Sequence, residues 1–484
     1  MLNKKNYLRF LNHSCIELVT PNTTILCDPW FTGSAFSDGW SLLHDNSHDI
    51  NNLSFDYIWI SHEHPDHFSI PTINTLKKSK NFLFQKTKDQ KVKKFLESKG
   101  HKVIELINKK LTKVGDLEIA IITCDSYDSI LIAKFPNGIV VVNINDARVD
   151  QNDFVKFEIK PFIKQLYGER EIDLLAFQYS YANWAGNKSD KQIALHQQEL
   201  VDKKNKYVIK ELKPKFIMPF ASFVYYSHEE NFYWNGNDWL NHIDKVFNVN
   251  NQMILPNINQ KILLENSISR DELQKSNEIA KKFWDSKIKN IKPLTSAKSI
   301  SNDILRNQYD YFIDKLHDNN QLFKKIEAKE DFVISLRIFD LKKVISIGLF
   351  KNFFKLHDEE EKINITAEIS SETFSFLLRS AYGRGTITIN GRIQFNYDYA
   401  HRFFLFFFIF YANNLGIYFN KFSNVTRKML ESISKTAVME SILFFNTNAR
   451  SNLDKDLDYL YLLFQKKSLS ESDYEIFNNE PSII

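Results

Sequence analysis

The first half of the chain alternates short apolar runs with longer helical patterns. Each short run is rich in β-branched and aromatic residues and is bounded by turn residues, which is typical of strands. The predicted strands are residues 7–10, 15–19, 24–27, 57–60, 81–85, 102–106, 116–123, 129–134, 138–142, 173–177 and 215–218. Helices are predicted near residues 70–78, 89–99 and 190–210. Strands that alternate with helices predict an α/β fold.

The second half of the chain has a different pattern. It becomes polar and helical after residue 257, with Ser269 at a capped helix start. Alternating apolar residues, which predict strands, return at 331–354 and 363–369. We therefore predict three parts, which are a catalytic domain at 1–257, a helical connection at 258–330 and a smaller α+β domain at 331–484.

The last of these parts contains a helix-turn-strand pattern. Ser370 caps an apolar helix that reaches Tyr382, and β-branched residues at 386–390 predict a strand. This pattern faintly resembles sterol-carrier-type domains, which cover apolar ligands. A small α+β domain that serves for dimerisation or as a lid over the active site is the preferred prediction. The most apolar run, Phe403–Ala412, predicts a buried helix, because it has about half the length that a membrane span needs.

Composition narrows the class of partner. Lys plus Arg is 63 and Asp plus Glu is 59 in 484 residues, and this near-balance argues against a nucleic-acid binder, which needs a basic stripe. The three cysteines are too widely spaced for a disulfide framework or a Cys-x-x-Cys metal site. No apolar segment follows the charged residues at the start. We expect a reduced, cytoplasmic protein without a membrane span that acts on a small molecule, and homo-oligomerisation stays open.

Four metal-binding side chains follow the predicted strand 57–60 within a few residues. The run reads His62-Glu63-His64-Pro65-Asp66-His67. Two imidazoles two positions apart can leave an extended segment on the same side and share one cation. Asp66 and His67 can then face a second cation nearby. Zinc and ferrous iron accept this mixture of nitrogen and carboxylate ligands.

This run resembles the signature of the metallo-β-lactamase superfamily. The resemblance implies a four-layer αββα sandwich with a mono- or dinuclear metal site at one edge. It also implies two divalent metal ions, with zinc as the first expectation and iron or manganese as alternatives. The motif is specific for the superfamily and not for the reaction.

The resemblance also assigns residues by position. The implied ligands are His62, His64, Asp66, His67 and Asp146. Asp146 follows a predicted strand, where the family has a carboxylate that bridges two cations and so lowers the pKa of a shared water. Asp28 matches an aspartate that orients the histidine loop. The alternatives are ordinary turns, in which Asp28 caps the turn before Pro29 and Asp146 forms an Asx turn.

Two positions depart from the family pattern. The third histidine is missing, and Asp125 and Asp128 stand in its region. The last histidine is also missing from its usual loop, where the nearest histidine is His228, with Glu229 or Glu230 as alternative ligands. Additional carboxylates suit iron or manganese at least as well as zinc.

Five short segments narrow the resemblance, namely Asp28-Pro29-Trp30, Asn143-Ile144-Asn145-Asp146, Gln178-Tyr179-Ser180, Phe220-Ala221-Ser222-Phe223 and Ser227-His228-Glu229-Glu230-Asn231. With them, residues 7–235 resemble the metallo-β-lactamase-like part of CMP-N-acetylneuraminate hydroxylases. Those enzymes carry a Rieske iron–sulfur module, but no cysteine here is followed by a histidine two residues later. The first hypothesis is a hydrolase that uses a metal-activated water on a phosphoester, ester or amide. The alternative is an iron-dependent oxygenase that acts on a sugar nucleotide or related metabolite with an external electron donor. A binding protein that has lost turnover is the third.

Three residues are candidates for catalysis in either enzyme. His13 and Tyr179 are expected to orient the substrate or donate a proton, and Asp66 counts as both a ligand and a catalytic residue.

Overall fold

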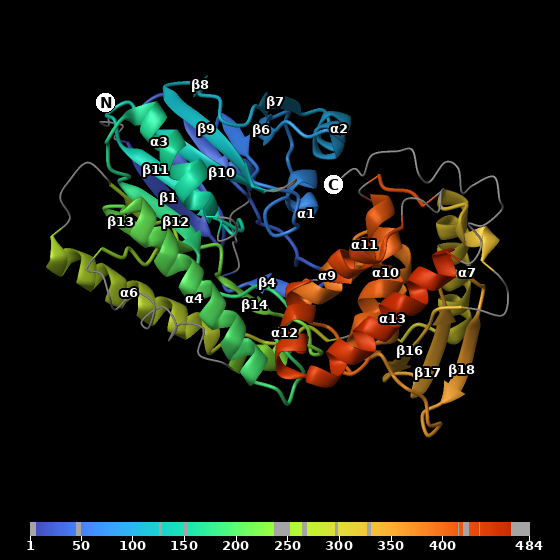
Figure 1. The fold of residues 1–484 in the computed structure, drawn as a ribbon. Coiled ribbons are helices and arrows are strands. Elements are labelled where there is room, and N and C mark those ends of the chain that lie inside the picture. Colours follow the sequence, from blue (N-terminus) through green and yellow to red (C-terminus); the bar gives the residue numbers. More distant parts are fainter. Residues whose placement is uncertain are drawn as a thin grey trace. The chain divides into compact units, whose positions relative to one another are not determined.

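The computed structural model folds as two compact units, each built from separated segments of the chain (Figure 1). The first unit contains residues 1–182, 198–227 and 234–293, and the second contains residues 183–197, 228–233 and 294–484. The structure describes residues 6–44, 50–124, 128–149, 153–236, 252–263, 269–295, 299–326, 331–414, 416–419, 425–434 and 436–465. The predicted domain boundaries, at 257/258 and 330/331, stay a prediction.

Two sheets form the centre of the first unit. The first has the order β15 (Lys261–Ile262), β1 (Tyr7–Asn12), β2 (Cys15–Val19), β3 (Thr24–Cys27), β5 (Tyr57–Trp59), β6 (Asn81–Gln85) and β7 (Lys102–Leu106). The second has the order β13 (Phe216–Phe220), β12 (Leu174–Gln178), β11 (Val140–Asn145), β10 (Asp128–Lys134), β9 (Leu117–Cys124) and β8 (Thr112–Val114). A small pair, β14 (Val224–Tyr226) and β4 (Trp40–Leu42), completes the strands.

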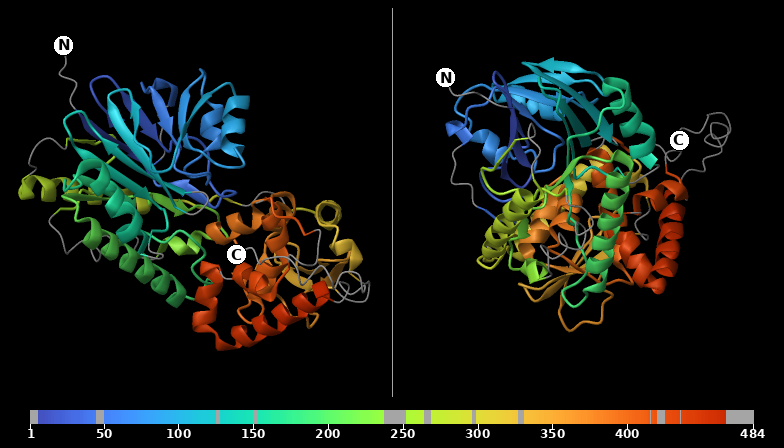
Figure 2. Two further views of the ribbon diagram at one scale, coloured as in Figure 1. Left: turned by 45° about the horizontal axis from the view of Figure 1, so that its top comes forward. Right: turned by 90° about the vertical axis from the view of Figure 1, so that its left-hand side faces the viewer.

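Helices cover the outer faces of these sheets (Figure 2). They are α1 (Ile70–Asn74), α2 (Lys91–Ser98), α3 (Lys160–Tyr167), α4 (Gln192–Leu212, of which residues from Gln198 onward belong to this unit) and α6 (Arg270–Ile288). One apolar core joins both sheets with α3, α4 and α6, and a second joins the first sheet to α1 and α2. Because both faces of each sheet are covered, the central strands are apolar throughout. This arrangement confirms the predicted αββα sandwich.

The candidate residues meet because several strands end at the same edge. Strand β3 is parallel to β5, and β11, β12 and β13 are parallel to one another. Parallel strands have their carboxyl ends on one side of a sheet, which is where α/β proteins place their sites. Asp28 follows β3, the histidine run follows β5 and Asp146 follows β11.

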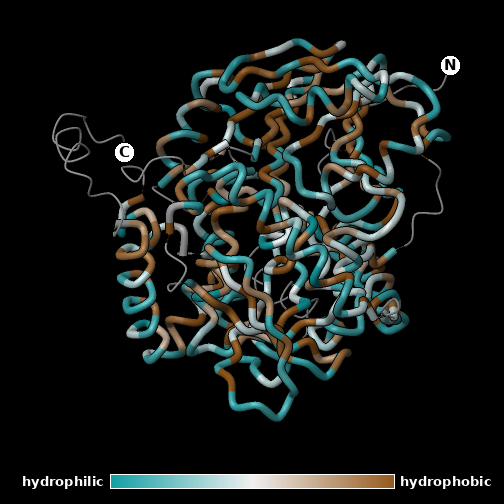
Figure 3. Tube along the Cα trace, turned by 90° about the vertical axis from the view of Figure 1, so that its right-hand side faces the viewer, coloured by the Kyte–Doolittle hydropathy of each residue, from teal (hydrophilic) through white to brown (hydrophobic). Residues whose placement is uncertain are grey.

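A third sheet forms the second unit. Its order is β18 (Phe354–Asp358), β17 (Lys343–Gly348), β16 (Val333–Ile338), β19 (Ala367–Ile369) and β20 (Gln394–Phe395). Its helices are α7 (Asn302–Asn319), α8 (Ser371–Arg379), α9 (Gly383–Asn390), α10 (Ala400–Asn414), α11 (Arg427–Ser434), α12 (Ala437–Phe445) and α13 (Thr447–Gln465). Hydrophobic and hydrophilic residues alternate along the trace, as expected for elements with one buried face (Figure 3).

The prediction of a buried helix at Phe403–Ala412 is confirmed. Helix α10 is apolar on every side, and Phe403 to Phe410 all lie in the core of the second unit. A helix that is hydrophobic all round is typical of such a core. Within the described ranges, no helix combines the length and the apolar character that crossing a membrane requires.

Three predicted elements differ from the structure. Residues 386–390 form the second part of helix α9 and not a strand. Packing decides the conformation of so short a β-branched run. Ile387 is buried in the core, and Gly391, with φ of 70°, ends the helix in the left-handed region. The predicted strand at 363–369 is shorter, since only Ala367–Ile369 pairs in the sheet. Helix α1 likewise ends at Asn74 and not at residue 78.

Candidate metal centre

The first group of donor atoms lies directly after β5. His62 Nε2 and His64 Nδ1 lie 2.9 Å apart. Asp146 Oδ2 lies 3.6 Å from His62 Nε2, and all three residues offer ligand atoms within 4.8 Å of one another. The two imidazoles leave the extended segment on the same side, as the spacing predicts.

A second group of donor atoms adjoins the first. It contains His13, Asp66 and His67, and Asp66 Oδ2 lies 3.1 Å from His13 Nε2 and 3.3 Å from His67 Nε2. Asp146 Oδ2 lies 3.7 Å from His67 Nε2, which nearly equals its distance to His62 Nε2. The Asp146 carboxylate therefore lies between the nitrogen donors of the two groups, as a bridging ligand requires.

Unsatisfied oxygens show that these residues fit a cation. Asp66 Oδ1 and Asp146 Oδ1 are buried, and neither has a hydrogen-bond partner among the residues that the structure describes. A buried carboxylate oxygen without a partner is costly, and buried charges are usually paired or coordinate a metal. His62, His64, Asp66, His67 and Asp146 would hold the ions, with a donor set that zinc and iron both accept.

The protonation equilibria of His62, His64 and Asp66 suit ligands of a cation, whereas that of His67 favours the charged ring when no cation is bound. Burial lowers the pKa of His62 and of His64, so both rings favour the neutral form that binds metals. Burial raises the pKa of Asp66, but the neighbouring His67 and the hydrogen bond with His13 outweigh it and hold the pKa well below its usual range. Burial lowers the pKa of His67, but Asp66 and Asp146 raise it well above the usual value.

Asp28 lies behind the donor atoms. It is fully buried, it accepts hydrogen bonds from Ser61 N and Ser61 Oγ, both at 2.7 Å, and His67 Nδ1 lies 3.1 Å from its Oδ2. Asn145 joins the same group. The sequence reasoning did not select Ser61 or Asn145, although each is a polar residue at the end of an apolar strand and next to a predicted ligand.

The missing third histidine leaves a carboxylate in its region. Asp128 begins β10, and its Oδ1 lies 3.9 Å from His62 Nδ1. Asp125, the other candidate, lies outside the described residues. Asp128 is thus the described carboxylate that can add to the first group.

Tyr179 is buried away from solvent. Its ring packs against Phe223 with centroids 5.9 Å apart, and its backbone N–H donates to Ser222 Oγ. Burial raises the pKa of its hydroxyl above the usual value, which disfavours ionisation. A catalytic role for Tyr179 stays a prediction.

His228 belongs to the second unit, where it lies beside three charged residues. Its Nε2 is 3.7 Å from Glu372 Oε2 and its Nδ1 is 3.5 Å from Glu230 Oε1. Arg392 donates to both carboxylates, at 2.8 Å to Glu230 and 2.6 Å to Glu372. The guanidinium already supplies a positive charge here, so a metal ion would compete with it. The predicted role of His228 as a ligand for the first unit stays a prediction.

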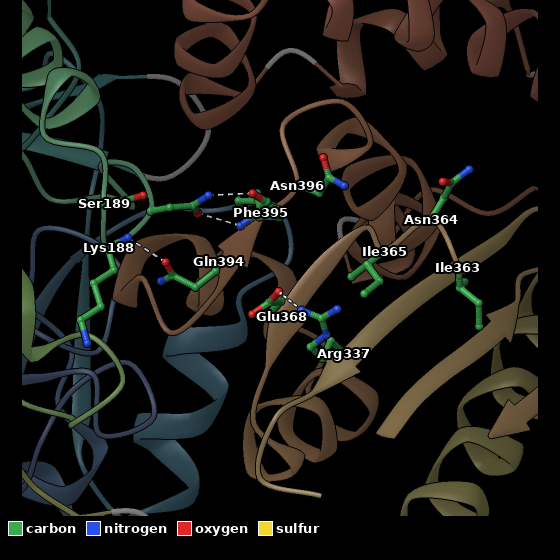
Figure 4. Close-up of a pocket in the computed structure, with 11 residues that line it drawn as sticks. Lys188, Ser189, Arg337, Ile363, Asn364, Ile365, Glu368, Gln394, Phe395 and Asn396 are labelled. Atoms are coloured by element: carbon green, nitrogen blue, oxygen red, sulfur yellow. Dashed lines mark hydrogen bonds and ion pairs between the residues drawn. The ribbon is translucent and has the colours of Figure 1, made fainter. Parts of the chain in front are cut away.

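The second unit also contains a cavity of about 630 Å³. It lies beside strands β16, β19 and β20, and Figure 4 shows Arg337 and Glu368 pointing toward one another within it. Arg337 Nη1 donates to Glu368 Oε1 at 2.7 Å. None of the predicted site residues lines this cavity.

The comparisons with known proteins agree with the geometry of the first unit. Residues 7–134 match the model of the beta-lactamase superfamily domain. The chain contains a metallo-β-lactamase-type domain. The match covers the histidine run and Asp28, and the fold confirms the predicted superfamily.

Several cytidine monophosphate-N-acetylneuraminic acid hydroxylases resemble a short part of the chain. The protein from Danio rerio is 40% identical over 75 residues, which is 15% of this chain and 13% of that protein. The protein from Xenopus laevis is 44% identical over 69 residues, 14% of this chain and 12% of its own. The chain thus matches only about an eighth of the length of these relatives.

Solved structures resemble about half of the chain. The diiron β-hydroxylase CmlA from Streptomyces venezuelae has a TM-score of 0.39 and 14% identity, and the match covers 54% of each chain. A possible metal-dependent hydrolase from Veillonella parvula has a TM-score of 0.37 and 14% identity, over 54% of this chain and 99% of its own.

Proposed function

We propose that this chain is an iron-dependent hydroxylase with a dinuclear metal centre. The observation that carries the proposal is the donor set of the first group, in which His62 Nε2 and His64 Nδ1 meet a carboxylate and no third histidine joins them among the described residues. Two histidines and one carboxylate with open positions are typical of non-haem iron oxygenases.

A carboxylate, Asp128, stands in the region where a zinc hydrolase of this superfamily has its third histidine. Asp146 is proposed to bridge, and Asp128 to supply the further ligand near His62. Asp66 and His67 would hold the second ion, with His13 fixing the orientation of the Asp66 carboxylate. When bound, iron at such a centre supplies the activation of dioxygen.

The overall reaction sets what else is needed. Hydroxylation puts one oxygen atom of O₂ into a C–H bond and reduces the other to water, which consumes two electrons and two protons. A separate electron donor is therefore part of the proposal. The substrate class we propose is a sugar nucleotide or a similar polar metabolite. The partial similarity to the cytidine monophosphate-N-acetylneuraminic acid hydroxylases supports this class.

Hydrolysis is the second candidate. The near-equal distances from Asp146 Oδ2 to the two histidine nitrogens favour it, because two ions held by one carboxylate lower the pKa of a shared water. A phosphoester, ester or amide would then be the substrate.

One experiment separates the two. Protein purified without oxygen, added metal or chelator is analysed for its elements, and is then given a reductant, ¹⁸O₂ and candidate sugar nucleotides. About two iron ions per chain and a product heavier by one ¹⁸O atom are expected. Two zinc ions, no oxygen uptake and cleavage of an ester would replace the proposal with hydrolysis.

A further inference from the structure

Asn145 lies at the end of β11, immediately before Asp146, in an unusual backbone conformation. Its φ is 61°, in the left-handed region that asparagine tolerates better than most residues. The pairing of β11 with β12 shifts register between Asn143 and Asn145, as in a β-bulge. Bulges beside active sites often re-aim a side chain. Here the side chain of Asn145 is buried within the group behind the metal ligands.

The amide nitrogen of Asn145 contacts three members of that group. It donates to Asp28 Oδ2 at 2.7 Å and to Ser61 Oγ at 2.9 Å, and it lies 3.1 Å from His67 Nδ1. The amide cannot be turned round, because its oxygen would then face the Asp28 carboxylate at a hydrogen-bond distance. Each of its two N–H groups therefore has an acceptor.

These donors leave one consistent arrangement of protons. The Ser61 hydroxyl donates to Asp28 Oδ2 at 2.7 Å, so its lone pairs are left for Asn145 and for the N–H of His62 Nδ1, which is 3.0 Å away. His67 Nδ1 donates to Asp28 Oδ2 at 3.1 Å. With their protons on Nδ1, both rings turn Nε2 toward Asp146.

We propose that Asn145 is a positioning residue that keeps the ring proton of His62 on Nδ1, through Ser61, and so presents Nε2 of that ring to the metal ion. Without its amide, Asp28 Oδ2 and Ser61 Oγ each lose a hydrogen-bond donor, so Ser61 is held less firmly in the position from which it accepts the Nδ1 proton of His62. Partners behind metal ligands fix the tautomer in this way and change metal affinity about 10- to 100-fold. The inference rests on the proposed metal centre.

Two substitutions suit the left-handed backbone at this position. Asn145→Gly removes the side chain, and Asn145→Asp keeps its shape but removes both donors. Asn143→Ala is the matched control. Asn143 lies on the same strand, and its buried side-chain amide makes no hydrogen bond to any residue that the structure describes.

The test measures metal affinity and the histidine tautomers separately. Competition with a coloured chelator, with Zn²⁺ or Co²⁺, is expected to show a drop of about 10-fold or more for both Asn145 variants and a change below about threefold for Asn143→Ala. ¹⁵N NMR of the metal-free proteins is expected to show the neutral ring of His62 protonated at Nδ1 in the wild type and a mixture of its two tautomers in the Asn145 variants.

The outcomes separate this inference from the proposed function. Folded Asn145 variants with wild-type affinity and wild-type tautomers would overturn the role of Asn145 and leave the metal centre intact. A wild-type protein that binds neither ion would overturn the metal centre itself. Unfolding of one variant leaves the other to decide, because the two differ in volume and charge.

Discussion

At the scale of single residues, the centre combines adjacent ligands with distant ones. His62, His64, Asp66 and His67 lie within six positions, so the local chain brings them together whatever the rest of the fold does. His13 and Asp66 are 53 positions apart and still lie 3.1 Å from each other. Most of the predicted ligands therefore come from one short run of the sequence. The orientation of their side chains depends on residues far away in the sequence.

Replacing His64 tests the first group. His64→Ala is expected to remove at least one metal equivalent, because it deletes one of the two nitrogens that face the same point. His101→Ala is the control, as His101 is a buried histidine of the same unit that donates nothing to the centre and instead accepts from Lys80 N. Elemental analysis of both proteins checks this, and unchanged metal content in His64→Ala would contradict the assignment.

The carboxylate at position 128 is expected to influence which metal the centre prefers. Asp128→His supplies the third histidine that zinc hydrolases use, so we expect the zinc-to-iron ratio of the purified protein to rise severalfold. Asp128→Asn keeps the shape, removes the charge and is expected to lower the content of both metals. Equal ratios in wild type and Asp128→His would show that Asp128 is not a ligand.

At the scale of elements, a segment from the first half of the sequence completes the second unit. Trp184 is fully buried in that core, its N–H donates to Thr388 O at 2.6 Å, and its Nε1 donates to Ile393 O at 3.1 Å. Asn187 bonds both backbone groups of Phe395 on β20, and so caps the edge of the sheet. Sequence-based boundaries miss such a contribution because it spans about 200 residues.

Removing Trp184 tests that contribution. Trp184→Ala is expected to lower the free energy of unfolding by about 3–5 kcal/mol, since it leaves a large cavity and leaves Ile393 O without its side-chain donor. Phe444→Ala removes an aromatic ring that is 66% exposed, and it should change the free energy of unfolding by less than about 0.5 kcal/mol. Urea unfolding of both variants provides the measurement, and equal effects would mean that residues near 184 do not belong to the core.

Asp331 couples the start of β16 to the end of β17 and makes this sheet sensitive to pH. Its Oδ1 accepts from the backbone N–H groups of Phe332, Leu349 and Phe350, while burial raises its pKa to about 6. The unfolded carboxyl titrates near 4, so the stability this group contributes is present at low pH and is lost as the pH rises through about 6.

Asp331→Asn should therefore flatten the stability profile. Asparagine keeps the accepting oxygen but carries no charge. The free energy of unfolding of Asp331→Asn, relative to that of the wild type, should therefore rise by about 2 kcal/mol between pH 4 and pH 7. Asp318→Asn, at an exposed position on α7, is the control. Urea midpoints across this pH range measure the effect, and parallel profiles for wild type and Asp331→Asn would refute it.

At the scale of the whole molecule, bound metal should stabilise the folded chain. The proposed ligands come from the loop after β5 and the end of β11, and these segments converge only in the folded state. A ligand present at 100 times its dissociation constant adds about 2.7 kcal/mol to the free energy of unfolding. A chelator is expected to lower the melting temperature of the wild type by several degrees and that of His64→Ala by less. Identical shifts would place the stabilising metal elsewhere.

The sequence by itself determined the features that depend on local spacing. The histidine run, the strand ends that carry Asp28 and Asp146, the caps at Ser269 and Ser370, and the buried helix at Phe403–Ala412 are all readable from neighbours in the chain. The superfamily follows from the same run, because its ligands need no distant partner to be recognised.

Only the tertiary structure decided what depends on long-range contacts. It brought Asn145 to Asp28 across 117 positions, grouped His228 with Arg392, and made residues 386–390 a helix against the alternation of their side chains. A run of four β-branched residues has a weak intrinsic preference for a strand, which the packing of Ile387 into the core overrides. Hydrogen bonds between residues a hundred positions apart leave no periodic signal, and so they appear only when the chain has folded.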